Sequence, residues 1–412
     1  MHVVIGNSTA VQAFQAGVQA VTAALKDLPT QLTPRLALAF CSGDLDAHGF
    51  YAGIRQLLGD WVPVVGGSAM GLCWAQQCVT EGPCAAVVIL AGDDWEWQLA
   101  TSQDIYRDPH LSGEVLAGQL PSLPDSRCLL VLFDSIRFAA TAQNPPVLVP
   151  SGPMISGVHH PRLKHLPLFG AGLIGDPQFN LTWQFSGDGV SRHSASALQL
   201  AGQFQVASCI MHGCVPLSNR HFTVTDVFGQ YLYQLDNEPI VPLLDRLTGS
   251  QEWRHLKHSP SGAPLPVTTL ALARPLGDDS DEQQLVTRLM TGVMPGDDAV
   301  MLFEADFIKG QQVMLMRRDP QLMLQSARDN TTRLLAQIKE NGQQGRLALY
   351  FDCGGRMSAI SGSDGEEAEI VRDLCVGAGI PFLAIYTGVE IAPLQGASYG
   401  LDWSGVLVIL TQ

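Results

Sequence analysis

The sequence has few basic residues: 24 Lys and Arg stand against 39 Asp and Glu, which gives a formal net charge of −15. An acidic chain is repelled by phosphate backbones and anionic lipids, so we expect neither nucleic acid nor a membrane as a partner. The first lysine is Lys26, and apolar runs end well before the ~18 residues that a spanning helix needs. We therefore expect no signal peptide and no membrane-spanning segment, and we predict a cytoplasmic protein.

A recognisable cysteine motif is also missing. The nine cysteines are scattered singly through apolar segments, and none forms a Cys-x-x-Cys pair. This odd, scattered set favours buried thiols in a reducing compartment over a disulfide framework. His159, His160 and His165 have no carboxylate or cysteine at ligand spacing beside them, so we predict no metal site. We expect no cofactor either.

What the chain does contain indicates a layered α/β protein. Its 412 residues exceed one ordinary hydrophobic core, and 46% apolar residues with 41 glycines fit a compact, turn-rich fold. We predict two parts, residues 1–225 and 226–412, each with mixed β-sheets layered by helices. Residues 259–266 are rich in Pro, Gly and Ser and read as a connection.

One pattern occurs more than once along the sequence. Residues 36–43 read LALAFCSG and residues 347–354 read LALYFDCG, so Cys41 ends an apolar run much as Cys353 does. In both stretches a helical segment, a Pro-led strand and a third strand follow, and a looser version begins near residue 128. We predict an internally duplicated strand–helix–strand–strand unit whose first strands occupy equivalent central places in their sheets.

The run from Gly170 to Gly175 matches the G-x-G-x-x-G fingerprint of dinucleotide-binding proteins. That fingerprint needs a helix after it, because the helix N-terminus meets the pyrophosphate. Here Asp176-Pro177 and a strand-like run follow instead. We interpret the glycines as a strand end where another backbone packs closely.

The strongest candidate site lies around residues 353–356, which read Cys-Gly-Gly-Arg. Arg356 offers a planar fork for a carboxylate, and the glycines let a small ligand approach the backbone. Tyr386, Thr387 and Glu390 follow the neighbouring strand, and open α/β sheets tend to bind ligands beyond their strand ends. The other interpretation is structural, with a buried cysteine and an arginine paired to Glu366 or Glu367.

His212 and Cys214 form a second candidate pair. A cysteine beside a histidine can become a reactive thiolate. Neighbouring residues of a strand point to opposite faces, however, and a structural histidine is the competing interpretation.

At these residues the sequence resembles the FIST family of sensor domains, which has an N-terminal and a C-terminal part. Cys353 and Arg356 stand where the family has Cys-x-x-Arg, and residues 381–392 resemble its Pro-Phe-x-Gly-Phe-Tyr-Thr-x-Gly-Glu-Ile-Ala. His212-Gly213 is a further match. Ala384 and Val389, which are bulkier, replace two family glycines. We expect the two parts to fill the chain, without a fused signalling domain.

The resemblance implies a sensor for a small ligand, with amino acids as candidates, and it carries over no catalytic residues. We therefore expect a zwitterionic or anionic ligand at Arg356, Cys353, Tyr386, Thr387, Glu390 and His212. In this hypothesis Arg356 holds a carboxylate and Glu390 accepts an ammonium. A signalling protein is a possible partner. The alternatives are a cysteine-dependent enzyme that uses Cys353 or Cys214, and a protein–protein adaptor.

Overall fold

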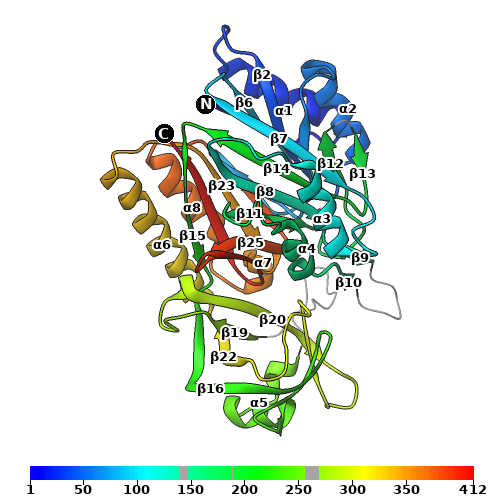
Figure 1. Cartoon of the computed structure of the whole chain (residues 1–412), viewed down its shortest axis with the longest axis vertical. Helices are drawn as coiled ribbons and strands as arrows, with labels where there is room; N and C mark the ends of the chain where they lie inside the picture. Colours follow the sequence, from blue (N-terminus) through cyan, green and yellow to red (C-terminus); the bar gives the residue numbers. More distant parts are fainter. Residues whose placement is uncertain (140–145, 188, 256–268) are drawn as a thin grey trace.

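The computed structural model describes residues 1–139, 146–187, 189–255 and 269–412, and its main body holds three six-stranded sheets (Figure 1). In each sheet, four strands from one stretch of chain share the same spatial order: first, fourth, second, third. In that order they are β1 (His2–Ser8), β6 (Ala85–Ala91), β2 (Pro34–Ser42) and β3 (Val64–Ala69); β7 (Trp95–Ser102), β14 (Ala195–Gly202), β8 (Ser126–Asp134) and β11 (Leu168–Leu173); and β15 (Gln205–Met211), β27 (Gly405–Thr411), β23 (Gly345–Cys353) and β24 (Phe382–Thr387).

The pairing register also agrees among the three sheets. The second strand pairs in parallel with the third and antiparallel with the fourth, and a register shift occurs at its start. Directly after the shift, Leu36 faces Leu90 and Leu347 faces Leu410. The two stretches that the sequence presents as copies thus have one strand order and one register. Counted from these pairs, Cys353 corresponds to Ser42.

This register corrects the comparison of Cys353 with Cys41. Cys41 pairs with Ala85, and the residue that pairs with Gly405 in the equivalent place is Asp352. Because side chains alternate between faces, a shift of one residue places the two cysteines on opposite faces of their sheets. Cys41 packs against helices, whereas Cys353 lies at the end of the inward-facing row.

Alternation along the strands separates a shared core from three outer cores. In β2, Leu36, Leu38 and Phe40 belong to a central cluster to which all three sheets contribute. Ala37 and Ala39 belong to an outer cluster under helices. Alternate residues face opposite sides of the sheet, and both sides are buried. These strands therefore read as continuous apolar runs.

Pairs of helices cover the outer faces of the sheets, as Figure 1 shows. Each pair comes from the connections within one four-stranded unit, and its apolar side packs on that unit's sheet. The pairs are α1 (Ala13–Asp27) with α2 (Ala47–Leu58), α3 (Pro109–Gln119) with α4 (Ser151–Val158), and α6 (Pro320–Glu340) with α8 (Glu367–Gly377).

The three sheets are interlocked by exchanged hairpins. The hairpin that follows the third strand of one unit extends the sheet of another, so every sheet contains strands from two stretches of chain. β12 (Gln184–Gly187) with β13 (Val190–Ser191) extends β3, β25 (Val389–Leu394) with β26 (Ala397–Leu401) extends β11, and β4 (Leu72–Trp74) with β5 (Gln77–Val79) extends β24.

Between β15 and α6 the chain builds a separate sheet, the lower part of Figure 1. Pairing of β16 with β17 closes its row of strands, and we call this unit the inserted barrel. It comprises β16 (Cys214–Phe228), β17 (Tyr231–Leu235), β18 (Glu238–Pro239), α5 (Ile240–Thr248), η1 (Glu252–Arg254), β19 (Leu270–Pro275), η2 (Glu282–Gln284), β20 (Leu285–Val293), β21 (Val300–Leu302) and β22 (Gln312–Arg318). The remaining elements are β9 (Ile136–Phe138), β10 (Val147–Leu148), η3 (Gly354–Arg356) and α7 (Ser358–Ser361).

Two expectations concern this region. The predicted connection at 259–266 lies outside the described residues. The predicted boundary between residues 225 and 226 falls within β16. The division of the chain into two parts at this position stays a prediction. Within the described residues, no helix combines the length and the apolarity needed to cross a bilayer.

Candidate functional site

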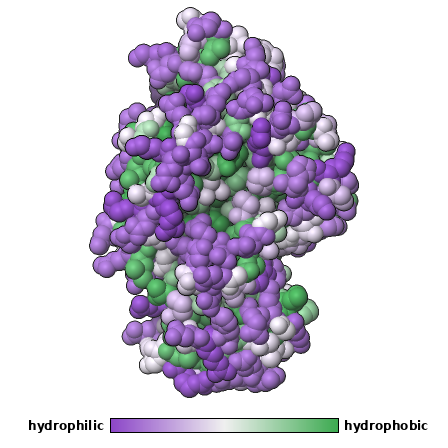
Figure 2. Space-filling view, turned by 60° about the vertical axis from the view of Figure 1, so that its left-hand side comes forward, coloured by the Kyte–Doolittle hydropathy of each residue, from purple (hydrophilic) through white to green (hydrophobic). Residues whose placement is uncertain are grey.

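A small pocket lies at one end of the central core. Met70, Ile174 and Gly388 line it from the ends of three equivalent strands, one from each sheet. Leu289 and Phe303 of the inserted barrel line its other side. Most of the wall is apolar. Figure 2 shows one face of the molecule, on which apolar residues lie in patches among hydrophilic ones. Ligand pockets commonly occupy such a place between units.

Asp402 is the carboxylate in the wall of this pocket. Its Oδ2 accepts a hydrogen bond of 3.1 Å from the backbone N–H of Leu289. Its Oδ1 is buried and has no hydrogen-bond partner among the described residues. Burial raises the pKa of this carboxyl to about 8, so at neutral pH much of it is protonated. A protonated carboxyl can donate as well as accept a hydrogen bond.

Cys353 and Thr387 are the two predicted site residues that line the pocket. The alternation along β23 turns Cys353 inward, in the same row as Phe351. Burial, and after it the nearby Glu390 carboxyl, raises the pKa of the Cys353 thiol well above its usual value. The thiolate is therefore scarce at neutral pH, and this environment does not activate a nucleophile.

Glu390 lies behind Thr387 and does not line the pocket. The Thr387 hydroxyl donates to Glu390 Oε1 at 2.9 Å. Glu390 Oε2 is buried and has no hydrogen-bond partner in the described part of the chain, and burial raises the pKa of the carboxyl well above its usual value. Glu390 is thus held mainly as a neutral acid that orients Thr387.

Arg356 is fully buried on the far side of the Gly354-Gly355 turn. Its Nη1 donates to the backbone carbonyls of His212 at 3.0 Å and Trp403 at 2.9 Å. Its Nη2 pairs with the carboxylate of Glu367, the first residue of α8. The structure therefore shows the fork of Arg356 holding two loops and a helix together.

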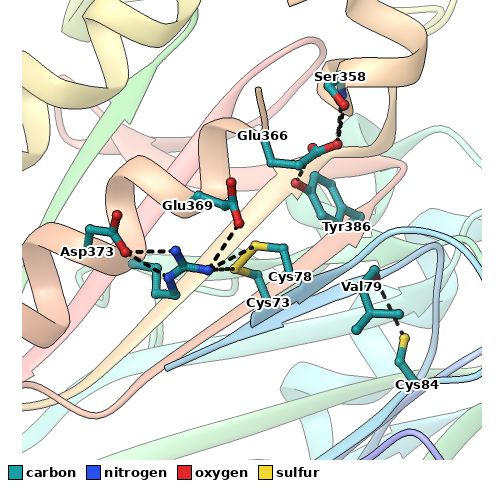
Figure 3. The surroundings of a disulfide bond; sticks show 10 residues. Cys73, Cys78, Val79, Cys84, Ser358, Glu366, Glu369, Asp373 and Tyr386 are labelled. Atoms are coloured by element: carbon teal, nitrogen blue, oxygen red, sulfur yellow. Dashed lines mark hydrogen bonds and ion pairs between the residues drawn. A yellow bond between two sulfur atoms is a disulfide. The ribbon is translucent and has the colours of Figure 1, made fainter. Parts of the chain in front are cut away.

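Tyr386 also faces away from the pocket, towards α8. Its hydroxyl donates to Glu366 Oε2 at 2.7 Å, and Glu366 in turn accepts from the Ser358 backbone N–H at 3.1 Å (Figure 3). Tyr350 makes the parallel contact, donating to Glu367 at 2.5 Å. The acidic pair at the start of α8 thus binds two strand tyrosines and Arg356 within the protein.

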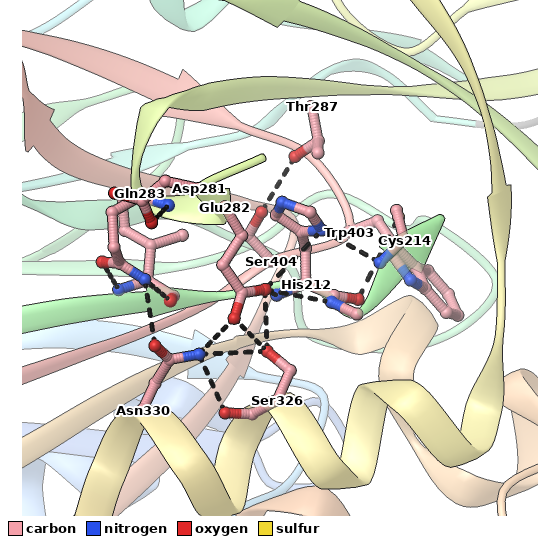
Figure 4. A network of polar contacts seen from close by, with 12 residues as sticks. His212, Cys214, Asp281, Glu282, Gln283, Thr287, Ser326, Asn330, Trp403 and Ser404 are labelled. Atoms are coloured by element: carbon pink, nitrogen blue, oxygen red, sulfur yellow. Dashed lines mark hydrogen bonds and ion pairs between the residues drawn. The ribbon is translucent and has the colours of Figure 1, made fainter. Parts of the chain in front are cut away.

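His212 is buried in a separate polar network shown in Figure 4. Glu282 accepts the backbone N–H of His212 at 3.1 Å and the hydroxyl of Ser326 at 2.8 Å. The Cys214 backbone N–H donates to His212 Nδ1 at 2.9 Å. Burial lowers the pKa of His212 and raises that of Cys214 to about 12. The histidine therefore contacts the backbone of Cys214, and the thiol stays protonated.

One disulfide corrects the expectation that all cysteines are separate thiols. Cys73 on β4 and Cys78 on β5 are cross-strand partners and are bonded, while the other seven cysteines are free and buried. Figure 3 shows the surroundings of this disulfide. The Arg372 guanidinium lies beside both sulfur atoms, with Nη1 at 3.9 Å from Cys73 Sγ and 4.0 Å from Cys78 Sγ. The sequence interval of five residues did not resemble a known motif, and only the hairpin brings the two together.

The glycine-rich run begins within strand β11, and the next element along the chain is strand β12, not a helix. Gly170 has φ +134°, and a Cβ there would lie 1.9 Å from the carbonyl oxygen of Val131. This agrees with a close backbone approach, as the sequence interpretation proposed. Among the described residues, no group of His, Cys, Asp and Glu could hold a metal ion.

Asp402, Leu289 and Phe303 were missed by the sequence reasoning, because nothing in their local sequence marks a site. They come from a turn before the last strand and from the inserted barrel. Only the packing of the barrel against the main body brings them to Cys353. A hydrogen bond between the Thr287 hydroxyl and the Asp402 carbonyl, 2.6 Å long, fixes this contact.

Comparison with solved structures found only distant likenesses. A chorismatase matches with 10% identity and a TM-score of 0.33, covering 92% of both chains. A cyanuric acid hydrolase from A. caulinodans matches with 10% identity and a TM-score of 0.35, covering 99% of this chain and 98% of that one. PurLQS from Thermotoga maritima matches with 8% identity and a TM-score of 0.23, covering 99% and 72%. Scores this low carry no weight for fold or function.

A search of curated proteins found no match. Family models do match: the FIST N domain over residues 35–238 and the FIST C domain over residues 251–393. Together these matches cover most of the chain, and they agree with the Cys-x-x-Arg and Pro-Phe motifs in its C-terminal part. The chain therefore belongs to the FIST family.

Proposed function

We propose that this protein is a sensor that binds a small amine or amino acid in the pocket at the end of the central core. FIST domains are small-ligand sensor domains, which supports the class of function. The chemical class of the ligand is inferred from the side chains in the pocket wall.

The observation that carries the proposal is the Asp402 carboxyl. Its Oδ1 is a buried polar atom in a mainly apolar wall, with no partner among the described residues. Such a group is costly unless something pairs with it. A ligand N–H, and an ammonium above all, would supply the missing hydrogen bond and charge. An apolar ligand body suits Met70, Ile174 and Phe303.

In this proposal the six predicted residues have different roles. Cys353 and Thr387 contact the ligand, Thr387 being oriented by Glu390. Arg356, Tyr386 and His212 do not line the pocket and support its wall from behind through hydrogen bonds within the protein. A ligand carboxylate at Arg356 would have to displace Glu367, so we give Arg356 a supporting role instead.

A thermal-shift panel of small amines, amino acids and carboxylic acids tests the proposal, because a ligand that binds only the folded state raises the melting temperature. We expect amines or amino acids to stabilise the protein in a way that depends on Asp402, whereas any response to acids without an amino group should not depend on Asp402. Asp402→Asn should lose the response. Asp93→Asn changes a fully exposed aspartate on the surface and should keep it.

Binding should also release protons. An ammonium favours the ionised form of Asp402, whose pKa of about 8 keeps it largely protonated in the empty pocket. Calorimetry at pH 7 in buffers of different ionisation heat would measure the proton count. A panel without any stabilising compound, together with a protein partner captured by the chain, would favour the adaptor alternative. Turnover with a covalent adduct on Cys353 would favour the enzyme. A cytoplasmic location remains part of the proposal, supported by the seven free thiols.

A further inference from the structure

Arg318, the last residue of β22, is a buried guanidinium without a counterion in the described part of the chain. Its residue is 7% exposed, and its Nε and Nη1 atoms have no hydrogen-bond partner there. The two other deeply buried arginines differ, since Arg288 pairs with Asp306 and Arg356 with Glu367. A buried charge is costly unless it is paired, so an unpaired guanidinium indicates a missing anion.

The groups that act most strongly on Arg318 are two thiols and the Arg356 guanidinium, and one carboxylate of this region, Glu282, lies 3.8 Å from His212 Nδ1. Its guanidinium carbon lies 3.9 Å from the centre of the Trp403 ring, a stacked cation–π arrangement. Cys214 is its cross-strand partner, and the nearby charges and thiols are those of Cys214, Cys353 and Arg356. Burial lowers the pKa of Arg318 to about 10, which still leaves it charged at neutral pH. The ring stabilises the cation but accepts none of its N–H groups.

The side chains beside Arg318 leave further donors without acceptors. Trp403 Nε1 is buried and has no partner among the residues described. His212 Nδ1 accepts from the Cys214 backbone, so the neutral ring carries its proton on Nε2, which is likewise buried and unpartnered in the described chain. Figure 4 shows His212, Cys214 and Trp403 close together. The unpartnered buried atoms of Arg318, Trp403 and His212 are thus all N–H donors, and donors require an acceptor.

We propose that Arg318, Trp403 and His212 form a binding site for a small anion, either a carboxylate or an inorganic oxyanion. The site lies behind the wall of the pocket: a Cβ on Gly355, which lines the pocket, would be 3.2 Å from the Trp403 ring. It is therefore distinct from the proposed amine pocket and does not depend on it. The planar fork of an arginine suits the two oxygens of a carboxylate or oxyanion.

Anion titrations with melting temperature as the readout test this proposal. Sodium formate, acetate and phosphate are compared with sodium gluconate at the same ionic strength, because gluconate is too bulky for a buried site. We expect either the carboxylates formate and acetate or phosphate to raise the melting temperature in a saturable way. The anion that gives the larger rise identifies the class that the site binds. Arg318→Met should abolish this rise. Arg317→Met should retain it, since the neighbouring Arg317 is exposed on the opposite face of β22 and pairs with Asp319.

A second variant and a second readout keep the test decisive should Arg318→Met fold poorly. Arg318→Lys keeps the charge without the fork and should show a weakened rise. Wild-type tryptophan emission should change on anion addition, and this change should vanish in Trp403→Phe. Equal responses in wild type and the Arg318 variants would overturn the proposal. So would a wild type that responds to none of the three anions, or an emission change that persists without Trp403.

Discussion

Arg356 and Glu367 form an ion pair in which neither side chain has any exposure to solvent. The pair joins the turn after β23 to the first residue of α8, while Nη1 of Arg356 donates to the His212 and Trp403 carbonyls. Asp352 lies 3.3 Å from Nε of the same guanidinium. The family-like Cys-x-x-Arg motif thus ends in an arginine that holds the floor of the pocket in place.

Removing the charge of Glu367 should destabilise the protein strongly. Glu367→Gln leaves the Arg356 charge buried with a weaker partner, which typically costs about 3–5 kcal/mol. Urea unfolding would measure the loss. The matched control is Glu369→Gln two residues later, where a half-exposed carboxylate pairs with Arg372 and the cost is about 0–1 kcal/mol. Similar losses in both variants would contradict the structural role of the buried pair.

Arg356→Lys should also lose stability, on the order of 3 kcal/mol, because an ammonium cannot bridge two carbonyls and a carboxylate in one plane. If the variant is still folded at low temperature, its pocket should respond to the stabilising amine with a reduced shift. A variant of unchanged stability that has lost ligand binding would instead return Arg356 to the role that the sequence suggested, a direct contact with the ligand.

Stability should depend on pH through Asp402 and Glu304. Burial raises their pKa values to about 8 and about 7, above the ordinary values near 4. Between about pH 4 and pH 8 the folded state therefore holds protons that the unfolded chain has released, so both groups make stability fall as pH rises. The slope is at most about 1.4 kcal/mol per pH unit for each group.

The variants Asp402→Asn and Glu304→Gln isolate this effect. Their free energies of unfolding, taken relative to the wild type, should rise steadily from pH 5 to pH 8. Glu304 accepts the Ser151 backbone N–H, which an amide oxygen can also accept. Asp93→Asn should show no such trend. A constant difference across this range would mean that the two carboxyls are ionised in the folded protein.

The free thiols should react slowly with iodoacetamide in the native protein. All seven are buried, and burial raises the pKa of Cys84 and Cys128 to about 12 and raises that of Cys41 and Cys209 well above the usual value. Peptide mass spectrometry before and after urea unfolding would compare their labelling. We expect Cys353 to be protected without ligand as well. Rapid labelling of Cys353 that a bound amine blocks would support the enzymatic alternative.

Reduction of Cys73–Cys78 should expose one reactive thiol. Cys78 is partly exposed, and Arg372 beside both sulfurs favours the thiolate, so Cys78 should be labelled first after dithiothreitol treatment. Loss of this short loop closure should cost about 2 kcal/mol of stability. Cys73→Ala with Cys78→Ala measures the same cost without reductant. Unchanged stability in the double variant would show that the crosslink contributes nothing.

Local sequence was sufficient for the strands and the family. Residues 36–43 and 347–354 are apolar on both faces, and a strand buried on both faces requires that pattern, so composition alone predicts their central place. The C-terminal motifs are by themselves enough to indicate the FIST family. Gly170 was also interpreted correctly as a place of close backbone approach, since a Cβ there would lie 1.9 Å from the carbonyl oxygen of Val131.

The direction of each side chain was decided only by tertiary structure. Adjacent strand residues face opposite ways, so Cys353 meets the pocket while Asp352 and Tyr386 face α8. Arg356 could pair with a ligand or with a glutamate, and the packing of α8 selected Glu367. The environments of Asp402 and Arg318 are created by contacts between segments far apart in sequence, and the Cys73–Cys78 bond is formed across a hairpin. Their chemistry depends on burial and on missing partners, which no local pattern encodes.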